Sequence, residues 1–308
     1  MRDETAASDP YAAASELAAY RDEPKQMPAG APGKNGYLRM RFARRGKRTV
    51  LSDLACRTPL LAQQALYYDD AMPSLASVMM ICTSGGTLQG DRHAIEIVAE
   101  HDAEARVTTQ SATKIQEMDA NFAAQTLDIV LGENAYVEYA PDAVIPYRDA
   151  RYVSRTRIAL PPSATLLYCE TLTSGRRHYR AERFEFALFS SAITASRPDG
   201  PTLCGEKLIL EPRGRDPRTA SVMAGFDVFA NVLLLTPPAH AARVFEQTSP
   251  LMDARRAAGA TRLPNGAGVA YKVVGEDRET VEDVVNAFCA RVRRVVKNAE
   301  TAPHFRWR

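Results

Sequence analysis

The stretch TSGGTLQGDRHAIEIVAEHDAEARVTTQSATK, from Thr83 to Lys114, is the part of the sequence that decides the fold class. It begins with a glycine-rich turn and continues into a segment where Ile95, Ile97 and Ala99 alternate with the intervening side chains. A period of two predicts a half-buried β-strand over residues 94–100. A turn and a hydroxyl-rich strand follow, so the stretch predicts β-structure in which short turns join successive strands.

Strand signals continue upstream of this stretch. Residues 75–82 (LASVMMIC) form a short apolar run, and this length favours a buried strand over a helix. Residues 37–55 alternate apolar and basic side chains and turn at Arg45-Gly46, which is typical of a β-hairpin. We therefore expect the folded body to start at Tyr37.

A weak repeat follows the opening stretch. The segments EHDAEARVTTQ, VLGENAYVEYA and LPPSATLLYCE share a turn, an alanine and a run of strand-forming residues. Their alanines, Ala105, Ala135 and Ala164, recur at intervals of about thirty residues, a period that predicts stacked hairpins or coils. An ordinary meander of strands would place turns at similar intervals, so both interpretations stay open at this point.

Helix signals are concentrated toward the C-terminus. Residues 238–246 predict a first helix, and residues 279–297 (ETVEDVVNAFCARVRRVVK) predict a longer one, with an apolar face, acids in the first turn and bases in the last. The chain is thus mainly β up to about residue 235 and helical after it, which argues against βαβ repeats. We predict a disordered tail over residues 1–36, a single β-rich domain over residues 37–297 and a frayed tail over residues 298–308.

Charge and cysteine content narrow the class of protein. The 308 residues carry 39 basic and 37 acidic side chains, so the chain lacks the strong positive field of a nonspecific nucleic-acid binder. The five cysteines are scattered and form no C-x-x-C pair, unlike a disulfide framework or a zinc knuckle. No apolar run is long enough to cross a bilayer, and the opening MRDETAASDP has acids where a signal peptide needs a basic region. We expect a reduced, cytoplasmic protein with no nucleic-acid or membrane partner.

Two motifs in the opening stretch resemble chemical sites. TSGGTLQGD has the glycines of a phosphate loop, but it lacks G-K-[ST] and no helix signal follows it, so glycines in a tight turn are the stronger interpretation. Asp91 would then close that turn or project into a polar interior. Ser111 and Lys114 have the S-x-x-K spacing of certain acyl-transfer enzymes, but the companion motifs S-D-N and K-T-G are absent. The five histidines fall at no spacing typical of a catalytic metal site.

Taken together, several segments resemble one known family, urease accessory protein D (UreD or UreH). They are YLRMRFARRGKRTVLSD, SGGTLQGD, VTTQSATK, VEYAPDAVIPYRDARY and ETLTSGRRHYRAERF, which occur in this order over roughly residues 37–210. The family commonly has a histidine-containing run before the glycines, a second glycine before the aspartate and an aromatic after the lysine. Here Cys82-Thr83-Ser84, Gln89-Gly90 and Ile115 take those places, which indicates a divergent branch or a second gene copy.

The resemblance implies a mainly β fold, wound as a solenoid-like (β-helical) stack of many strands with a few helices toward the C-terminus. It also implies a non-catalytic urease maturation factor that binds urease apoprotein and the accessory proteins F and G, the latter being the GTPase. Nickel would pass as cargo through an internal polar tunnel, with no tightly bound cofactor. The rival interpretation is a hydrolase or transferase that uses Ser111 and Lys114.

Under the tunnel hypothesis the carboxylates become candidate nickel contacts. Imidazole and thiolate sites would hold nickel firmly, whereas scattered carboxylates, amides and hydroxyls bind weakly enough to release it. We therefore predict that Asp91, Glu138, Asp142 and Glu170 line the tunnel, with Lys114 as an internal counter-ion. The alternative for each residue is an internal salt bridge or the closure of a turn.

Overall fold

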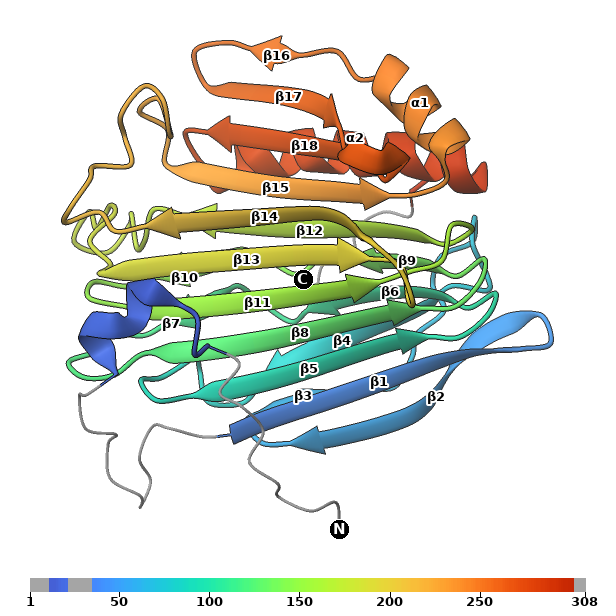
Figure 1. Cartoon of the computed structure of the whole chain (residues 1–308), viewed down its shortest axis with the longest axis horizontal. Helices are drawn as coiled ribbons and strands as arrows, with labels where there is room; N and C mark the ends of the chain where they lie inside the picture. Colours follow the sequence, from blue (N-terminus) through green and yellow to red (C-terminus); the bar gives the residue numbers. More distant parts are fainter. Residues whose placement is uncertain (1–10, 22–34, 302–308) are drawn as a thin grey trace.

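The computed structural model describes residues 11–21 and 35–301, in which two β-sheets pack face to face (Figure 1). Sheet A has seven strands in the order β14-β13-β11-β8-β5-β1-β2. Sheet B has eleven, nine of them in the order β16-β17-β18-β15-β12-β9-β6-β4-β3, while β10 pairs with β12 and β7. The chain is therefore mainly β, as its alternating pattern predicts.

The strands of sheet A are β1 (Asn35–Arg45), β2 (Arg48–Arg57), β5 (Arg92–Ala99), β8 (Ala123–Leu131), β11 (Arg151–Ala159), β13 (Leu188–Ser196) and β14 (Thr202–Leu210). The strands of sheet B are β3 (Leu60–Ala62), β4 (Ala76–Cys82), β6 (Glu104–Thr109), β7 (Thr113–Ile115), β9 (Tyr136–Tyr139), β10 (Val144–Pro146), β12 (Thr165–Thr173), β15 (Val228–Leu235), β16 (Leu251–Met252), β17 (Arg256–Arg262) and β18 (Gly268–Gly275). The helical elements are η1 (Ser15–Tyr20), α1 (Pro238–Glu246), η2 (Pro264–Gly266) and α2 (Arg278–Lys297).

From β4 to β13 the main strands alternate between the two sheets. Each of these strands runs parallel to the preceding main strand of its own sheet. In sheet A, for example, Ile97 pairs with Ile129 and Ile129 pairs with Ile158. In sheet B, Glu104 pairs with Tyr136 and Tyr136 with Thr165. The recurrence of about thirty residues therefore corresponds to parallel neighbours in one sheet.

The alignment of the repeat was wrong at its first copy. Ala135 and Ala164 occupy equivalent positions directly before β9 and β12, but the equivalent residue directly before β6 is Ala103, two positions before Ala105. Antiparallel strands end both sheets: β2 and β14 in sheet A, and in sheet B β3 at one end and β15, β18, β17 and β16 at the other. The solenoid-like winding of the whole stack stays a prediction.

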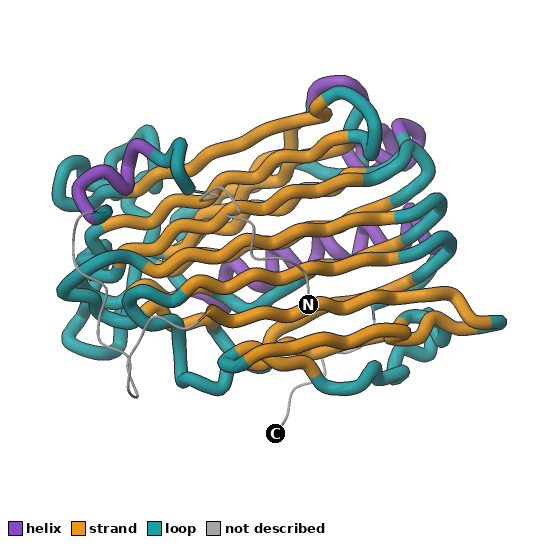
Figure 2. Tube along the Cα trace, turned by 60° about the horizontal axis from the view of Figure 1, so that its bottom comes forward, coloured by secondary structure: helices purple, strands orange, loops and turns teal. Residues whose placement is uncertain are grey.

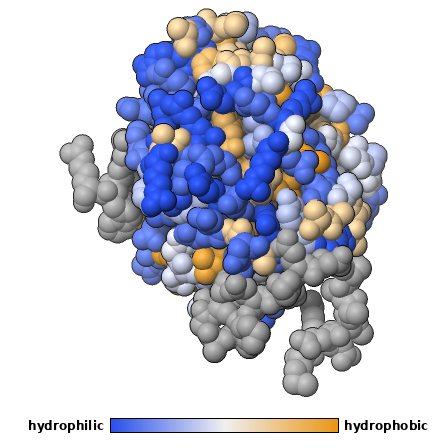
Figure 3. Space-filling view, turned by 90° about the vertical axis from the view of Figure 1, so that its left-hand side faces the viewer, coloured by the Kyte–Doolittle hydropathy of each residue, from blue (hydrophilic) through white to orange (hydrophobic). Residues whose placement is uncertain are grey.

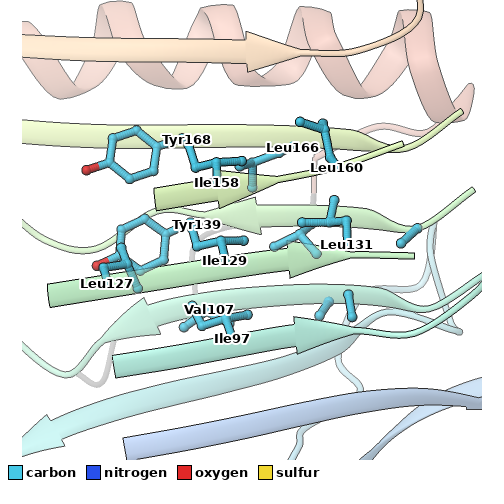
Figure 4. Packing of buried hydrophobic residues seen from close by; sticks show 14 of the residues in the cluster. Ile97, Val107, Leu127, Ile129, Leu131, Tyr139, Ile158, Leu160, Leu166 and Tyr168 are labelled. Carbon is cyan, nitrogen blue, oxygen red and sulfur yellow. The ribbon is translucent and has the colours of Figure 1, made fainter. Parts of the chain in front are cut away.

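The main hydrophobic core fills the space between the sheets. Ile97, Ile129 and Ile158 of sheet A face Val107 and Leu166 of sheet B (Figure 4), and all five are buried. The predicted alternation of β5 is confirmed, because Ile95, Ile97 and Ala99 are buried while their neighbours are only partly covered. Burial on one face is what fixes the register of such strands.

The two helices α1 and α2 cover the outer face of sheet B, and both were predicted at nearly these bounds. In Figure 2, α2 runs along the far side of the strands. Its apolar stripe, including Val281, Phe288 and Val292, packs against Leu234 and Tyr271 of the sheet. Asp277 caps its start by accepting a hydrogen bond from the backbone N–H of Thr280. Within the described residues, no helix combines the length and apolar character needed to cross a membrane.

The segment from Tyr11 to Arg21 corrects the prediction of a disordered tail over residues 1–36. Leu17 of η1 is fully buried, and with Tyr11 it packs against Phe122 and Leu188 on the outer face of sheet A. Similarly, Ala299, which lies in the predicted frayed tail, is buried beside Met72 and Tyr136. Residues 1–10, 22–34 and 302–308 lie outside the described residues.

Candidate functional site: a polar cavity between the sheets

A cavity of about 160 Å³ lies between the sheets, at the end of the molecule where β7 and β10 lie (left in Figure 1). This volume accommodates several water molecules. The exposed residues of its lining are Cys82, Gly85, Gln110, Ser111 and Lys114, which place its mouth at the two motifs of the opening stretch. Hydrophilic residues predominate on this end of the molecule, with apolar ones between them (Figure 3).

The glycine-rich turn shapes the mouth by packing against β7. Thr87 donates its backbone N–H to the carbonyl of Lys114 at 2.7 Å, and Gln116 donates to the carbonyl of Thr87 at 2.9 Å. Gly86 has φ +148°, and a Cβ at this position would lie 2.7 Å from the Lys114 carbonyl oxygen. The glycines therefore serve a close turn between strands, as the sequence predicts, and not a phosphate loop.

Aromatic and hydroxyl side chains line the interior of the cavity. Tyr139 and Tyr168 stack with ring centroids 5.3 Å apart, and their hydroxyls lie on the side of the rings away from Ile129, Ile158 and Leu166 (Figure 4). The hydroxyl of Thr156 lies 3.3 Å from that of Tyr168. Burial raises the pKa of both tyrosines, so their hydroxyls stay protonated and can both donate and accept hydrogen bonds.

Glu170 follows Tyr168 along this polar row and is partly buried. Its carboxylate accepts hydrogen bonds from Ser191 at 3.1 Å and from Tyr168 at 3.4 Å. Burial raises the pKa of Glu170, and nearby Glu206 adds to this effect. Glu170 is thus a carboxylate in the lining of the cavity, and its role as a nickel contact stays a prediction.

The polar row continues from Glu170 along sheet B to the edge of sheet A at β14. Glu170 pairs in register with Asn231 on β15, and Asn231 pairs with Lys272 on β18. Lys272 donates to the side-chain carbonyl of Asn231 at 2.7 Å and also forms an ion pair with Glu206. Because the Lys272 and Glu206 side chains are 36% and 34% exposed, the row reaches solvent there.

Asp142 lies near the mouth of the cavity and is half-buried. Its backbone N–H donates to the hydroxyl of Thr109 at 2.8 Å, and its carboxylate forms an ion pair with Arg278 at 2.7 Å. Lys114, the predicted counter-ion, also lies at the mouth, but its side chain is exposed. Asp142 is thus a carboxylate at the entrance, positioned by the first turn of α2.

Asp91 closes the turn before β5, as one of its two interpretations predicts. Its carboxylate accepts a hydrogen bond from the backbone N–H of Leu88 at 2.8 Å, and its own N–H donates to the Leu88 carbonyl. The side chain is fully buried, and its Oδ2 lies 3.6 Å from Nε2 of His93, which lines the cavity.

Glu138 lies on the other side of sheet B. Val137 and Tyr139 of β9 belong to the core between the sheets, so the alternation of the strand directs Glu138 toward α2. There it binds Arg293 through Nε and through Nη2 at 3.0 Å, and it accepts a hydrogen bond from Tyr136 at 2.7 Å. Glu138 is not part of the cavity lining; it is an internal salt-bridge residue, the alternative considered for each carboxylate.

The structure therefore separates the four predicted contacts. Asp142 and Glu170 line one cavity, Asp91 lies beside it, and Glu138 lies outside it. Within residues 11–21 and 35–301, no group of three His, Cys, Asp or Glu side chains is placed to hold a metal ion. Ser111 and Lys114 share the mouth, but no hydrogen bond joins them in this described part, so the geometry does not favour an activated nucleophile.

Two functional groups were missed by sequence reasoning. His93 shares the parity of Ile95 and Ile97 on β5, and this parity alone could have indicated a buried, inward-facing imidazole. Arg293 follows Val292 on α2, close to the basic last turn of the predicted helix, and its side chain is 1% exposed. The position of this charged residue directly beside the apolar stripe of the helix was the signal that could have indicated its burial.

Comparison with known proteins identifies a family over nearly the whole chain. The sequence model described as "UreD urease accessory protein" matches residues 34–308. "Urease accessory protein UreD 2" of Brucella canis is 48% identical over 297 residues, which cover 96% of this chain and 98% of the relative. "Urease accessory protein UreD" of Yersinia enterocolitica is 42% identical over 304 residues, covering 96% of this chain and 93% of the relative.

Proposed function

Because this chain belongs to the family of UreD urease accessory proteins, we propose that it is a non-catalytic factor in urease maturation. It works in the cytoplasm as a scaffold that binds urease apoprotein and the accessory proteins F and G. Nickel ions pass through its polar interior on their way to the urease active site.

The observation that carries this proposal is the cavity between the sheets. Asp142 at the mouth, the Thr156 and Tyr168 hydroxyls inside and Glu170 at the inner end supply oxygen donors along one row. Oxygen donors hold a first-row divalent ion less firmly than imidazole or thiolate clusters do. A path built from them allows the ion to enter and to leave, which conduction requires.

The continuation past Glu170 supports an exit at the edge of sheet A beside β14. The carboxylate of Glu206 and the amide of Asn231 extend the row of oxygen donors, and the ammonium of Lys272 lies between them. Since Lys272 is partly exposed, its side chain can swing away without unfolding the sheet. Movement of Lys272 then opens the row to solvent or to a bound partner.

Charge removal within the row tests the proposal. We expect the double variant Asp142→Asn/Glu170→Gln, co-expressed with urease and its accessory proteins, to give several-fold less active urease, while pull-down recovers the same partner complex. The matched control is Asp53→Asn/Glu100→Gln, which removes two partly exposed carboxylates paired with Arg39 and Arg41 of β1. Full urease activation by the first double variant would contradict the proposed path.

A further inference from the structure

His93 is a buried imidazole whose Nε2 has no hydrogen-bond partner within the described residues. The residue is 4% exposed and contributes to the lining of the cavity. An unpaired buried polar atom destabilises the folded state relative to a paired one, so its presence calls for an explanation.

The surrounding strands make room for this ring. His93 pairs with Gly36 on β1 and with Gln125 on β8. A Cβ at residue 36 would approach Cδ2 of His93 to 2.8 Å, so a glycine opposite the ring is needed to accommodate it. The imidazole is therefore held at the cavity wall by the sheet itself.

Asp91 supplies a second donor atom beside the ring. The separation of 3.6 Å between His93 Nε2 and Asp91 Oδ2 is too long for a hydrogen bond. When two ligand atoms bind the same first-row cation, each at about 2.1 Å, the two atoms lie about 3 to 3.5 Å apart. The pair is thus close to the spacing that a shared metal ion requires.

We propose that His93 and Asp91 form a transient binding site for a divalent transition-metal ion, nickel in the proposed function, within the cavity. This inference rests on the proposed function and adds a stopping point to the path. The two side chains bind the ion together, and water in the cavity completes its coordination. Because the chain supplies only two ligands, the ion can still move on toward Glu170.

The test is a titration of the untagged, full-length protein with nickel(II) alone, followed by calorimetry. We expect His93→Gln to weaken the tightest binding step by at least about tenfold, since even outer-shell changes alter metal affinity by 10–100-fold. The matched control is His101→Gln, which alters a second histidine beside an aspartate: His101 lies 2.8 Å from Asp102 but is exposed. Wild-type affinity in His93→Gln, or equal losses in both variants, would overturn the proposal.

A second measurement needs no variant. Anomalous diffraction at the nickel edge from wild-type crystals soaked in nickel(II) should place a peak within bonding distance of His93 Nε2. Nickel found only at surface histidines would overturn the site. Urease activation reports separately on the path: nickel bound at His93 together with full activation by Asp142→Asn/Glu170→Gln would refute the path and leave the site standing.

Discussion

Arg293 of helix α2 and Glu138 of strand β9 are 155 residues apart in sequence and form a two-pronged ion pair beneath the helix. Asp69 binds the third nitrogen of the same guanidinium, and the Arg293 and Glu138 side chains are 1% and 6% exposed. A buried arginine held by two carboxylates connects the loop before β4, sheet B and α2. This cluster explains why Glu138 serves stability and not the cavity.

We predict that Arg293→Ala lowers the free energy of unfolding by about 3–5 kcal/mol, because it leaves Asp69 without its cation and Glu138 with only the more distant Arg106, 3.8 Å away. Urea-induced unfolding followed by circular dichroism measures the change. The neighbouring Arg294→Ala is the control, since Arg294 is 53% exposed and its pair with Glu300 contributes about 0–1 kcal/mol. Equal effects in the two variants would mean that the buried cluster does not hold the helix.

Glu170 leads to a prediction about pH. Burial raises the pKa of Glu170 above its usual value of 4.5, so the folded protein binds this proton more readily than the unfolded chain. The contribution of Glu170 to the free energy of unfolding therefore falls as the pH rises from 4.5 through the raised pKa. Above the raised pKa, the loss of stability from ionising the buried carboxyl group is complete. The Gln side chain in Glu170→Gln cannot ionise.

We expect Glu170→Gln to gain stability relative to wild type as the pH rises from 4 to 8, measured by urea unfolding at each pH. The readout is how the stability difference between the variant and wild type changes with pH. A changed hydrogen bond alone would shift stability equally at every pH. A difference that stays constant over this range would show that ionised Glu170 is not disfavoured in the cavity.

The glycine turn at the mouth gives a third prediction. Gly86→Ala should lower the free energy of unfolding by about 1–3 kcal/mol, since the new Cβ meets the Lys114 carbonyl and the backbone conformation is strained for alanine. At Gly85 φ is +70°, and no atom lies within 4 Å of an added Cβ. Gly85→Ala should therefore lower the free energy of unfolding by only about 1–2 kcal/mol, from the left-handed backbone conformation alone. If Gly86→Ala proves no worse than Gly85→Ala in chemical unfolding, the close approach of turn and β7 is not needed.

Local patterns predicted the elements well where only one face is buried. The alternation at Ile95 and Ile97 identified β5, and the apolar stripe around Phe288 identified α2, because period and burial coincide there. The turn at Arg45-Gly46 likewise joins β1 to β2, with Gly46 at φ +58°. In these places the sequence pattern follows directly from the burial of one face or from the geometry of a turn, so the pattern alone predicts the element.

Prediction failed where both faces of a strand are covered. All four residues of β9 are buried, since Val137 and Tyr139 face the other sheet while Tyr136 and Glu138 face α2. Period-two alternation cannot distinguish the two sides of such a strand, so Glu138 was assigned to the wrong one. Leu17 was missed for a related reason: its burial depends on a sheet face that only the complete fold creates.

The two exposed cysteines allow a direct block of the cavity mouth. Cys82 lies at the mouth, whereas Cys56 lies on the edge strand β2 and does not line the cavity. A bulky maleimide placed on Cys82 in a Cys56→Ser background should occlude the entrance, and the same label on Cys56 in a Cys82→Ser background is the matched control. Pull-down with urease and the accessory proteins establishes that each labelled protein still assembles.

The most direct test of the central claim is nickel-dependent activation of urease apoprotein by these two labelled proteins in otherwise identical complexes. Passage through the cavity predicts that the label on Cys82 abolishes most of the activation while the label on Cys56 leaves it intact. Full activation by an assembled complex whose Cys82 is completely labelled would contradict the claim that nickel enters between the sheets.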